Sequence, residues 1–268
     1  MMNATEPRTR LAYTDRGNPA HPVLICLHAI GHSARDFEDL GTRLLGSHRV
    51  IAIDFPGQGN SDPDTKPSCC ARYTELLEHF VGDLNLTRFA ILGNSIGGAT
   101  AVRYASLHPE RVVALVLCDS GGLRPPSPID RLFIRLFVQF FAAGRRRAKW
   151  FPWAFDRYYR MMLCEPASFA RREEIVKSAY EIAPVLEQAW RSFADPGEDL
   201  SALLAQIECP VLLAWAKADF VIPVQANAAA IEIFPDHRLE LFEGGHSAFL
   251  EDPDRFERIL RDFMAGLK

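Results

Sequence analysis

A glycine-rich turn between an apolar run and a helix-like stretch constrains the fold more than any other feature of the sequence. The turn is Gly93-Asn94-Ser95-Ile96-Gly97-Gly98, preceded by Phe89–Leu92 and followed by Ala99–Leu107. A strand that turns sharply into a helix holds its central residue in a strained backbone conformation, which requires neighbours without bulky side chains. The pattern therefore predicts a strand, a tight turn and a helix, with the Ser95 hydroxyl presented beside the helix N-terminus.

A nucleophilic serine needs a base to take its proton and an acid to orient that base, and candidates for both follow predicted strands. Asp219 comes after the apolar run Pro210–Trp215, and His246 comes after Arg238–Phe242. The carboxyl ends of parallel strands meet at one edge of a sheet, where active sites assemble. The sequence therefore predicts Ser95 as the nucleophile, His246 as the base and Asp219 as the acid.

Asp119 is an alternative acid, because it also ends a predicted strand, Val112–Leu117. The segment Asp119–Gly122, however, has the composition of a plain turn, and this favours Asp219. Structural roles are open for the favoured residues as well. Asp219 has the position of a helix cap, and His246 that of a polar loop residue.

The turn around Ser95 and the order Ser, Asp, His resemble the nucleophile elbow and the catalytic residues of the serine-nucleophile branch of the α/β-hydrolase superfamily. The resemblance covers the chain from near Arg8 to its end. It implies an α/β fold, with a mostly parallel central sheet, helices on both faces and an inserted helical cap. It also implies an oxyanion hole formed by the backbone N–H groups of Ile96 and Ile30. The implied mechanism needs no metal or organic cofactor.

The loop that carries Ile30 follows the predicted strand Val23–Leu27 and contains two histidines. We expect His28 to be a structural residue, hydrogen-bonded beneath the loop. His32 is a candidate for lining the substrate pocket, although a solvated loop position is the plainer expectation. The turn-forming segment Asp54–Ser61 is expected to support this loop and has no role in phosphate binding, since it lacks the lysine of a P-loop.

The pattern of strands and helices divides the chain into a core, residues 1–122 and 204–268, and an inserted cap, residues 123–203. Prolines in Leu123–Pro128 interrupt regular structure, and only helical patterns follow until strands return at Val211. The stretch Asp130–Phe141 is apolar on nearly every side, so it must be buried or face an apolar partner. We expect packing between cap and core, with Phe133, Phe137, Phe140 and Phe141 as candidates for lining an apolar acyl pocket.

The composition indicates a globular enzyme. With 268 residues and 48% hydrophobic side chains, the chain can bury one large core, and a net charge of −4 gives no case for nucleic acid. Met1–Arg10 is polar and no apolar run of about 18 residues occurs, so we expect neither export nor membrane insertion, and a cytoplasmic location. The basic run Arg145–Arg147, with Lys149 and nearby tryptophans, leaves peripheral contact with an anionic membrane open. The oligomeric state is not predicted.

A serine at the elbow argues against epoxide or carbon–halogen chemistry, which uses a carboxylate there. We expect hydrolysis of an apolar carboxylic ester through an acyl-enzyme, as in carboxylesterases and lipases. The alternative within the same superfamily is hydrolysis of a carbon–carbon bond in ring-cleavage products, because Gly93–Ala101 and Gly121–Leu123 look like those enzymes. Such a substrate is anionic, so an arginine in the pocket would favour it. A second alternative is a slow-turnover ligand-binding receptor on the same scaffold.

Overall fold

Within residues 9–267, a single seven-stranded sheet forms the centre of the molecule. The computed structural model describes residues 9–267, so most of the polar segment Met1–Arg10 lies outside it. The strand order is β1-β3-β2-β4-β5-β6-β7, with β1 antiparallel to β3 and every other neighbouring pair parallel. The mostly parallel α/β sheet expected from the sequence is confirmed. The strands are β1 Tyr13–Arg16, β2 Val23–Leu27, β3 Arg49–Ile53, β4 Phe89–Asn94, β5 Val112–Cys118, β6 Val211–Ala216 and β7 His237–Phe242.

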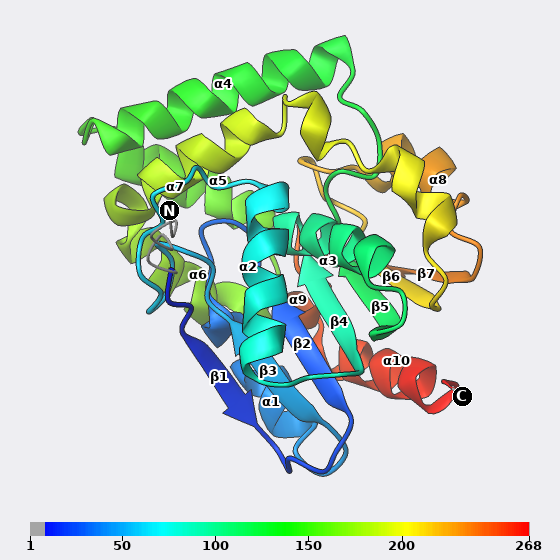
Figure 1. Cartoon of the computed structure of the whole chain (residues 1–268). Helices are drawn as coiled ribbons and strands as arrows, with labels where there is room; N and C mark the ends of the chain where they lie inside the picture. The colour runs from blue at the N-terminus through cyan, green and yellow to red at the C-terminus, as the bar shows by residue number, and fades with distance from the viewer. Residues whose placement is uncertain (1–8, 268) are drawn as a thin grey trace, which may run out of the picture.

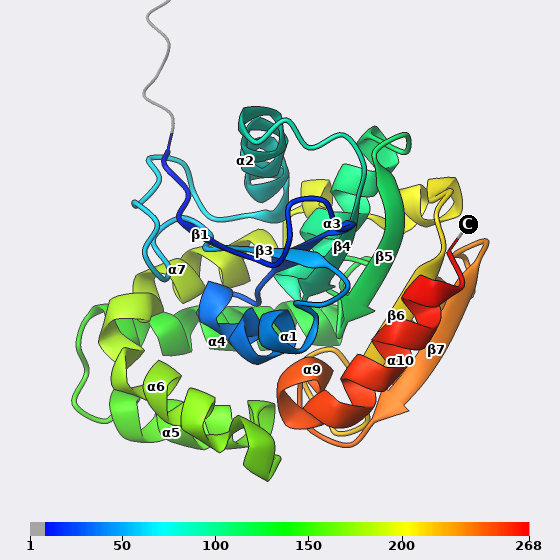
Figure 2. The same ribbon diagram turned by 90° about the horizontal axis from the view of Figure 1, so that it is seen from below.

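Alternate side chains of the strands pack into separate cores on the two faces of the sheet. Ile25 and Leu27 of β2 belong to one apolar cluster, whereas Leu24 and Cys26 belong to the other, and all four are fully buried. Parallel strands that are buried on both faces therefore have continuous runs of apolar residues in the sequence. The first face is covered by α2 Cys70–Asp83, α3 Ile96–Leu107 and α8 Val224–Ile231, and the second by α1 Glu38–Arg43, α9 Ala248–Glu251 and α10 Pro253–Ala265 (Figures 1 and 2).

The helices between β5 and β6, which we call the helical insertion, lie above the carboxyl ends of the parallel strands (Figure 1). Its first helix begins where the sequence provides a capping box: Ser127 Oγ accepts from the Asp130 N–H, and the Asp130 carboxylate accepts from the Ser127 N–H. Pro128 at the first helical position has no N–H to leave unpaired. The α-helices are α4 Pro128–Arg145, α5 Phe151–Met162, α6 Phe169–Lys177 and α7 Ala179–Ser192, and short 3₁₀ turns at Pro166–Ser168, Pro196–Glu198 and Ser201–Gln206 complete the segment.

Aromatic side chains fill the interior of the helical insertion. The ring of Phe137 stacks on Trp190 of α7 with centroids 4.3 Å apart, and Phe141 packs edge to face against Phe155 of α5. Both phenylalanines lie on the side of α4 that faces α5 and α7. The helical insertion therefore has an apolar interior of its own, which is continuous with the core above the sheet.

Candidate active site

Ser95 occupies a strained turn between β4 and α3. The backbone φ of Ser95 is 56°, in the left-handed region that residues other than glycine rarely adopt. Ser95 directly precedes the first residue of α3. A Cβ at Gly97 would collide with the carbonyl oxygen of Leu27, and one at Gly93 would collide with that of Gly97. The two glycines are needed because the turn is packed backbone against backbone. This turn places Ser95 at the positive end of the helix, as predicted from the sequence.

His246 and Asp219 form a buried hydrogen-bonded pair. His246 Nδ1 lies 2.8 Å from Asp219 Oδ2, and both side chains are almost fully buried. The other carboxylate oxygen, Oδ1, accepts from the N–H groups of Val221 and Ile222 at 2.8 and 2.9 Å. These bonds fix the carboxylate so that it receives the Nδ1–H of the imidazole. Nε2 is then the nitrogen that is able to accept a proton.

Asn94 joins the serine turn to the histidine loop, a role that the sequence analysis missed. Its side-chain amide donates to the carbonyl oxygens of Cys118 and His246 at 3.0 and 2.9 Å, and its oxygen accepts from Ser247 Oγ at 2.8 Å. Asn94 is fully buried, so all of these bonds are shielded from water. The residue before Ser95 thus fixes the position of the loop after β7.

Glu251 is a second residue that the sequence analysis missed. Its buried carboxylate accepts from the N–H groups of Gly245, His246 and Ser247 at 2.9 to 3.1 Å. It also accepts from Cys164 and Glu165, which follow α5, at 2.8 and 3.3 Å. One carboxylate therefore ties the histidine loop to the helical insertion.

Replacing Glu251 with alanine is expected to destabilise the protein by at least about 3 kcal/mol, because several buried N–H groups lose their acceptor together. It should also lower kcat by about 10-fold or more, because the backbone of His246 is released. Chemical unfolding and steady-state rates measure the two effects. Glu251→Gln, which keeps one acceptor oxygen, is the control and should lose less of both; equal losses in the two variants would contradict this role.

The loop after β2 is held in place from below, as the sequence analysis predicted. Gly31 N–H donates to Gln58 Oε1 at 2.6 Å, and Ala34 N–H donates to Asp54 Oδ1 at 2.6 Å. The positive φ of this loop, 81°, falls on Gly31, and Ala29 has a negative φ, which an alanine adopts without strain. Ile30 and Ile96 both line the pocket. The segment after β3 therefore supports the loop that carries Ile30.

His28 is a structural residue, as expected. Its Nδ1 donates to the Ala29 carbonyl oxygen at 2.6 Å, and its Nε2 accepts from the Phe55 N–H at 2.9 Å. Burial lowers the pKa of His28 to about 4, so the ring stays neutral at physiological pH. Both ring nitrogens are therefore occupied, and His28 is not a second base.

His32 lies in the pocket wall, and the expectation of a solvated position is wrong. The side chain is buried, with Nδ1 2.6 Å from Asp36 Oδ2, and Arg171 Nε donates to the other oxygen of Asp36 at 2.6 Å. Burial would raise the pKa of Asp36, but the charges of His32 and Arg171 hold it well below its ordinary value. Asp36 is therefore ionised and orients His32, which leaves Nε2 for the pocket. The His32 ring packs against Tyr159 of α5, and Arg171 of α6 binds its partner Asp36, so both contacts come from residues distant in sequence.

Asp119 lies next to the His246–Asp219 pair but has no bond to the imidazole. Its Oδ1 accepts from the Ala216 N–H at 2.8 Å, and its Oδ2 is buried with no hydrogen-bond partner in residues 9–267. One carboxylate oxygen of Asp119, one of Asp219 and one ring nitrogen of His246 lie within 4.8 Å of one another. Burial and the charge of Asp219 raise the pKa of Asp119 well above its ordinary value. Burial and the charge of Asp219 therefore favour the protonated, uncharged form of Asp119.

Asp119→Asn is expected to stabilise the protein at pH 8, with a smaller gain at pH 5. The unfolded chain ionises Asp119 near pH 4, whereas the folded chain retains the proton, so this residue costs stability as the pH rises above 4. Asparagine keeps an oxygen that accepts from the Ala216 N–H and removes the ionisable carboxyl group, so this cost disappears. Urea unfolding of both proteins at the two pH values measures the difference. A loss of stability at pH 8 would show that Asp119 is instead ionised and stabilising.

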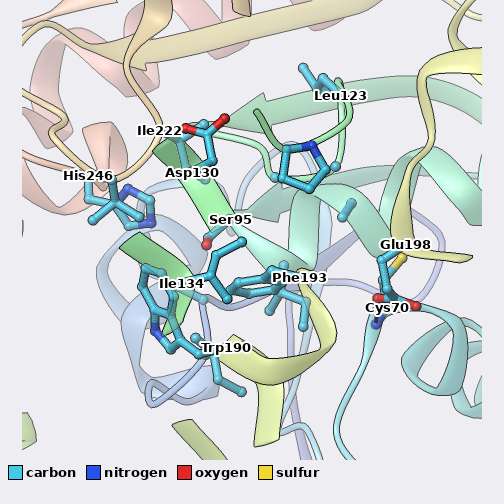
Figure 3. Close-up of a pocket in the computed structure, with 18 of the residues that line it drawn as sticks. Cys70, Ser95, Leu123, Asp130, Ile134, Trp190, Phe193, Glu198, Ile222 and His246 are labelled. Atoms are coloured by element: carbon cyan, nitrogen blue, oxygen red, sulfur yellow. Dashed lines mark hydrogen bonds between the residues drawn. The ribbon is translucent and has the colours of Figure 1, made fainter. Parts of the chain in front are cut away.

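The pocket opens between the sheet edge and the helical insertion. Ser95 lies at its centre in Figure 3, with His246 on one side and Glu198 and Cys70 on the far side. From the helical insertion come Phe133 and Ile134 of α4, Tyr158 and Tyr159 of α5 and Trp190 of α7. The structure thus brings Ser95, His246, Ile30, Ile96, His32 and Phe133 to one cavity, as the sequence analysis expected for a substrate site.

Three of the four phenylalanines proposed for the pocket are placed elsewhere. Phe137, Phe140 and Phe141 pack among the aromatic rings of α5 and α7 and are absent from the pocket wall. The reason is their position along the helix axis, since only the first turns of α4 reach the cavity. The expectation that these three side chains line an acyl pocket is therefore wrong, whereas Phe133 does line it.

Comparison with known proteins identifies the class. The Alpha/beta hydrolase family profile matches residues 24–259, so the chain belongs to this family. A curated relative, 2-hydroxy-6-oxononadienedioate/2-hydroxy-6-oxononatrienedioate hydrolase 2 of Pseudomonas putida, is 28% identical over 95% of this chain and 91% of its own length. The fold is shared with a thermophilic esterase from Thermogutta terrifontis (TM-score 0.80, 22% identity, 98% of this chain and 96% of that one). It is also shared with 2-hydroxy-6-oxo-6-phenylhexa-2,4-dienoate hydrolase from Rhodococcus sp. strain RHA1 (TM-score 0.78, 22% identity, 97% and 100%). No helix within residues 9–267 is long and apolar enough to cross a membrane.

Proposed function

We propose that this protein is a serine hydrolase in which Ser95 attacks a carbonyl carbon and His246 takes the proton of its hydroxyl. Asp219 holds the imidazole in the tautomer that leaves Nε2 free, and the N–H groups of Ile30 and Ile96 receive the oxyanion. The helical insertion acts as the cap of the pocket, with the core and cap divided as the sequence analysis expects. The observation that carries this proposal is that Ser95 and His246 line the same pocket while Asp219 binds His246 from behind.

The curated relative supports carbon–carbon bond hydrolysis better than ester hydrolysis. The compound in its name, 2-hydroxy-6-oxononadienedioate, has a ketone, an enol and two carboxylates but no ester. Its hydrolysis must therefore break a carbon–carbon bond next to the ketone, with water supplying OH to the acyl fragment and H to the leaving carbon. We propose this bond as the one cleaved here, in a vinylogous keto acid from ring cleavage.

Polar groups in the pocket wall support a substrate with one anionic end. The Nε atom of Arg124 and the indole nitrogen of Trp190 are buried hydrogen-bond donors that have no partner in residues 9–267. Both residues line the pocket. Orphaned buried donors are costly unless a ligand supplies an acceptor. Within residues 9–267, Arg124 is the one arginine or lysine of the pocket wall, and it also pairs with Asp130 at 2.7 Å. Three other arginines of the helical insertion, Arg131, Arg135 and Arg157, do not line the cavity.

A second carboxylate on the substrate is disfavoured, because Asp130, Glu198 and Asp199 already line the pocket. The remaining wall is apolar, with Phe133, Ile134 and other side chains of the helical insertion. We therefore propose a monocarboxylate ring-cleavage product with an apolar group on its keto carbon, in place of the dioate of the curated relative.

The test compares 2-hydroxy-6-oxo-6-phenylhexa-2,4-dienoate with 2-hydroxy-6-oxononadienedioate, following the loss of absorbance of the conjugated dienol. We expect kcat/KM to be at least about 10-fold higher for the phenyl compound, in line with the cost of an unmatched buried charge. Trp190→Phe should raise KM for it, because the indole donor is lost. Turnover of neither compound by a protein that hydrolyses esters would overturn the proposal.

An apolar ester is the second candidate, favoured by the apolar wall around Ser95. It is tested with p-nitrophenyl esters from acetate to palmitate. Turnover that depends on Ser95 and has a clear chain-length optimum would establish an esterase. One slow turnover per molecule, with tight binding of the product, would instead support the receptor alternative.

A further inference from the structure

We propose that α4, α5 and the loop between them form a docking surface for a bilayer that contains anionic phospholipids. We call residues 128–162 the basic segment. It contains eight arginine or lysine residues and two aspartates, while the whole chain has a net charge of −4, so the rest of the chain is strongly acidic. Such an uneven distribution of charge indicates an anionic partner for this part of the molecule. The proposal goes beyond the proposed hydrolysis and needs no turnover.

Half of the cations in the basic segment are free to meet that partner. Within residues 9–267, four of them are exposed and form neither an ion pair nor a side-chain hydrogen bond, namely Arg135, Arg146, Lys149 and Arg157. The others are occupied at least in part, as with Arg145 and Arg147, which face Glu187 and Glu181 of α7. Free guanidinium and ammonium groups bind lipid phosphates without first breaking a bond within the protein.

The same segment exposes large apolar side chains. Ile129, Leu132 and Leu136 are 79%, 58% and 59% exposed, and their spacing places them in one stripe along α4. The opposite side of α4 is buried, with Ile134 and Val138 facing inward. Figure 1 shows α4 along the outer edge of the molecule, away from the sheet.

Two tryptophans and a methionine add to this exposed apolar surface. Trp150, Trp153 and Met161 are 52%, 71% and 51% exposed. The basic segment therefore holds six of the thirteen large apolar side chains that are exposed in residues 9–267. Tryptophan and leucine among basic residues are typical of helices that lie in the interface of a bilayer.

A bilayer fits this surface better than a second copy of the chain or a nucleic acid. A symmetric dimer through the basic segment would place like charges against each other. Nucleic acid would pair with the cations, but isoleucine and leucine gain nothing from a phosphate backbone. An anionic bilayer supplies both phosphates and an apolar layer beneath them. Because α4 also gives Phe133 and Ile134 to the pocket, docking would hold part of the pocket wall at the lipid surface.

The experiment is co-sedimentation of the full chain with vesicles, at about 0.1 M salt so that surface charges are only partly screened. One set is phosphatidylcholine alone, and the other contains about one third phosphatidylglycerol. We expect binding to be at least about 10-fold stronger with the anionic lipid. Arg146→Glu with Lys149→Glu should remove most of this gain, and Leu132→Ser with Trp153→Ser should weaken binding in both low and high salt.

Matched control variants distinguish docking through the basic segment from an effect of net charge and from non-specific hydrophobic binding. Arg88→Glu with Arg258→Glu makes the same change of charge at exposed sites elsewhere, and Leu107→Ser with Ile233→Ser removes exposed apolar groups elsewhere. Both control pairs should bind like the parent chain. Equal binding to the two lipids, equal losses in test and control pairs, or preference for a DNA duplex over anionic vesicles would each overturn the proposal. Hydrolysis of the soluble ring-cleavage product is measured separately and is independent of all these outcomes.

Discussion

Replacing Ser95 with alanine is expected to lower kcat by about 10³-fold or more, with a much smaller change in KM. The substitution removes the nucleophile but leaves the pocket walls and the His246–Asp219 pair in place. Residual activity would come from the oxyanion donors and from binding alone, which accelerate the reaction far less than the complete set of catalytic residues does. The measurement is the single-turnover and steady-state rate with the preferred substrate.

Ser120→Ala is the matched control for this variant. Ser120 is a fully buried serine near the same turn, but its hydroxyl bonds only to the neighbouring Gly121 carbonyl oxygen and does not line the pocket. It should keep kcat within about 3-fold of the parent chain, in line with the small effects of removing one locally satisfied hydroxyl. Near-normal turnover in a folded Ser95→Ala protein would show that the nucleophile is elsewhere.

The parts of the site that follow from local sequence were predictable. Ser95, Asp219 and His246 each follow a predicted strand, and parallel strands bring their carboxyl ends together whatever the details of packing. The buried strands were equally clear, because burial on both faces makes them continuous apolar runs. The strand β1 was not predicted, since Tyr13–Arg16 is short and only half-buried, and its antiparallel pairing depends on β3.

Residues that act through distant partners were not predictable from one sequence. Glu251 has its role because residues 164, 165 and 245–247 converge on it, and the sequence of α9 shows only an acidic residue near a helix end. His32 is buried and held by Asp36, which Arg171 of α6 also binds, and its ring lies against Tyr159 of α5. The apolar character of α4 predicted burial correctly, but it did not show that only its first turns reach the pocket.

Asp219→Asn is expected to lower kcat by about 10⁴-fold while the fold is kept. Asparagine retains an oxygen for the N–H groups of Val221 and Ile222, so the turn after β6 stays in place. Its amide, however, donates to His246 Nδ1 and moves the imidazole proton to Nε2, which then cannot accept the proton of Ser95. The effect is therefore a change of tautomer and falls on kcat.

Asp119→Asn provides the contrast that decides which acid is used. Burial and the charge of Asp219 raise the pKa of Asp119 well above its ordinary value, which favours the uncharged acid. Its carboxyl group bonds the Ala216 N–H and not the imidazole, so an amide changes little around the ring. We expect kcat within about 10-fold of the parent chain, far less than the loss from a misplaced imidazole proton. The rates of both variants across the pH range of activity make the comparison. A larger loss for Asp119→Asn than for Asp219→Asn would transfer the acid role to Asp119, because only the carboxylate that holds His246 in its reactive tautomer produces the large effect.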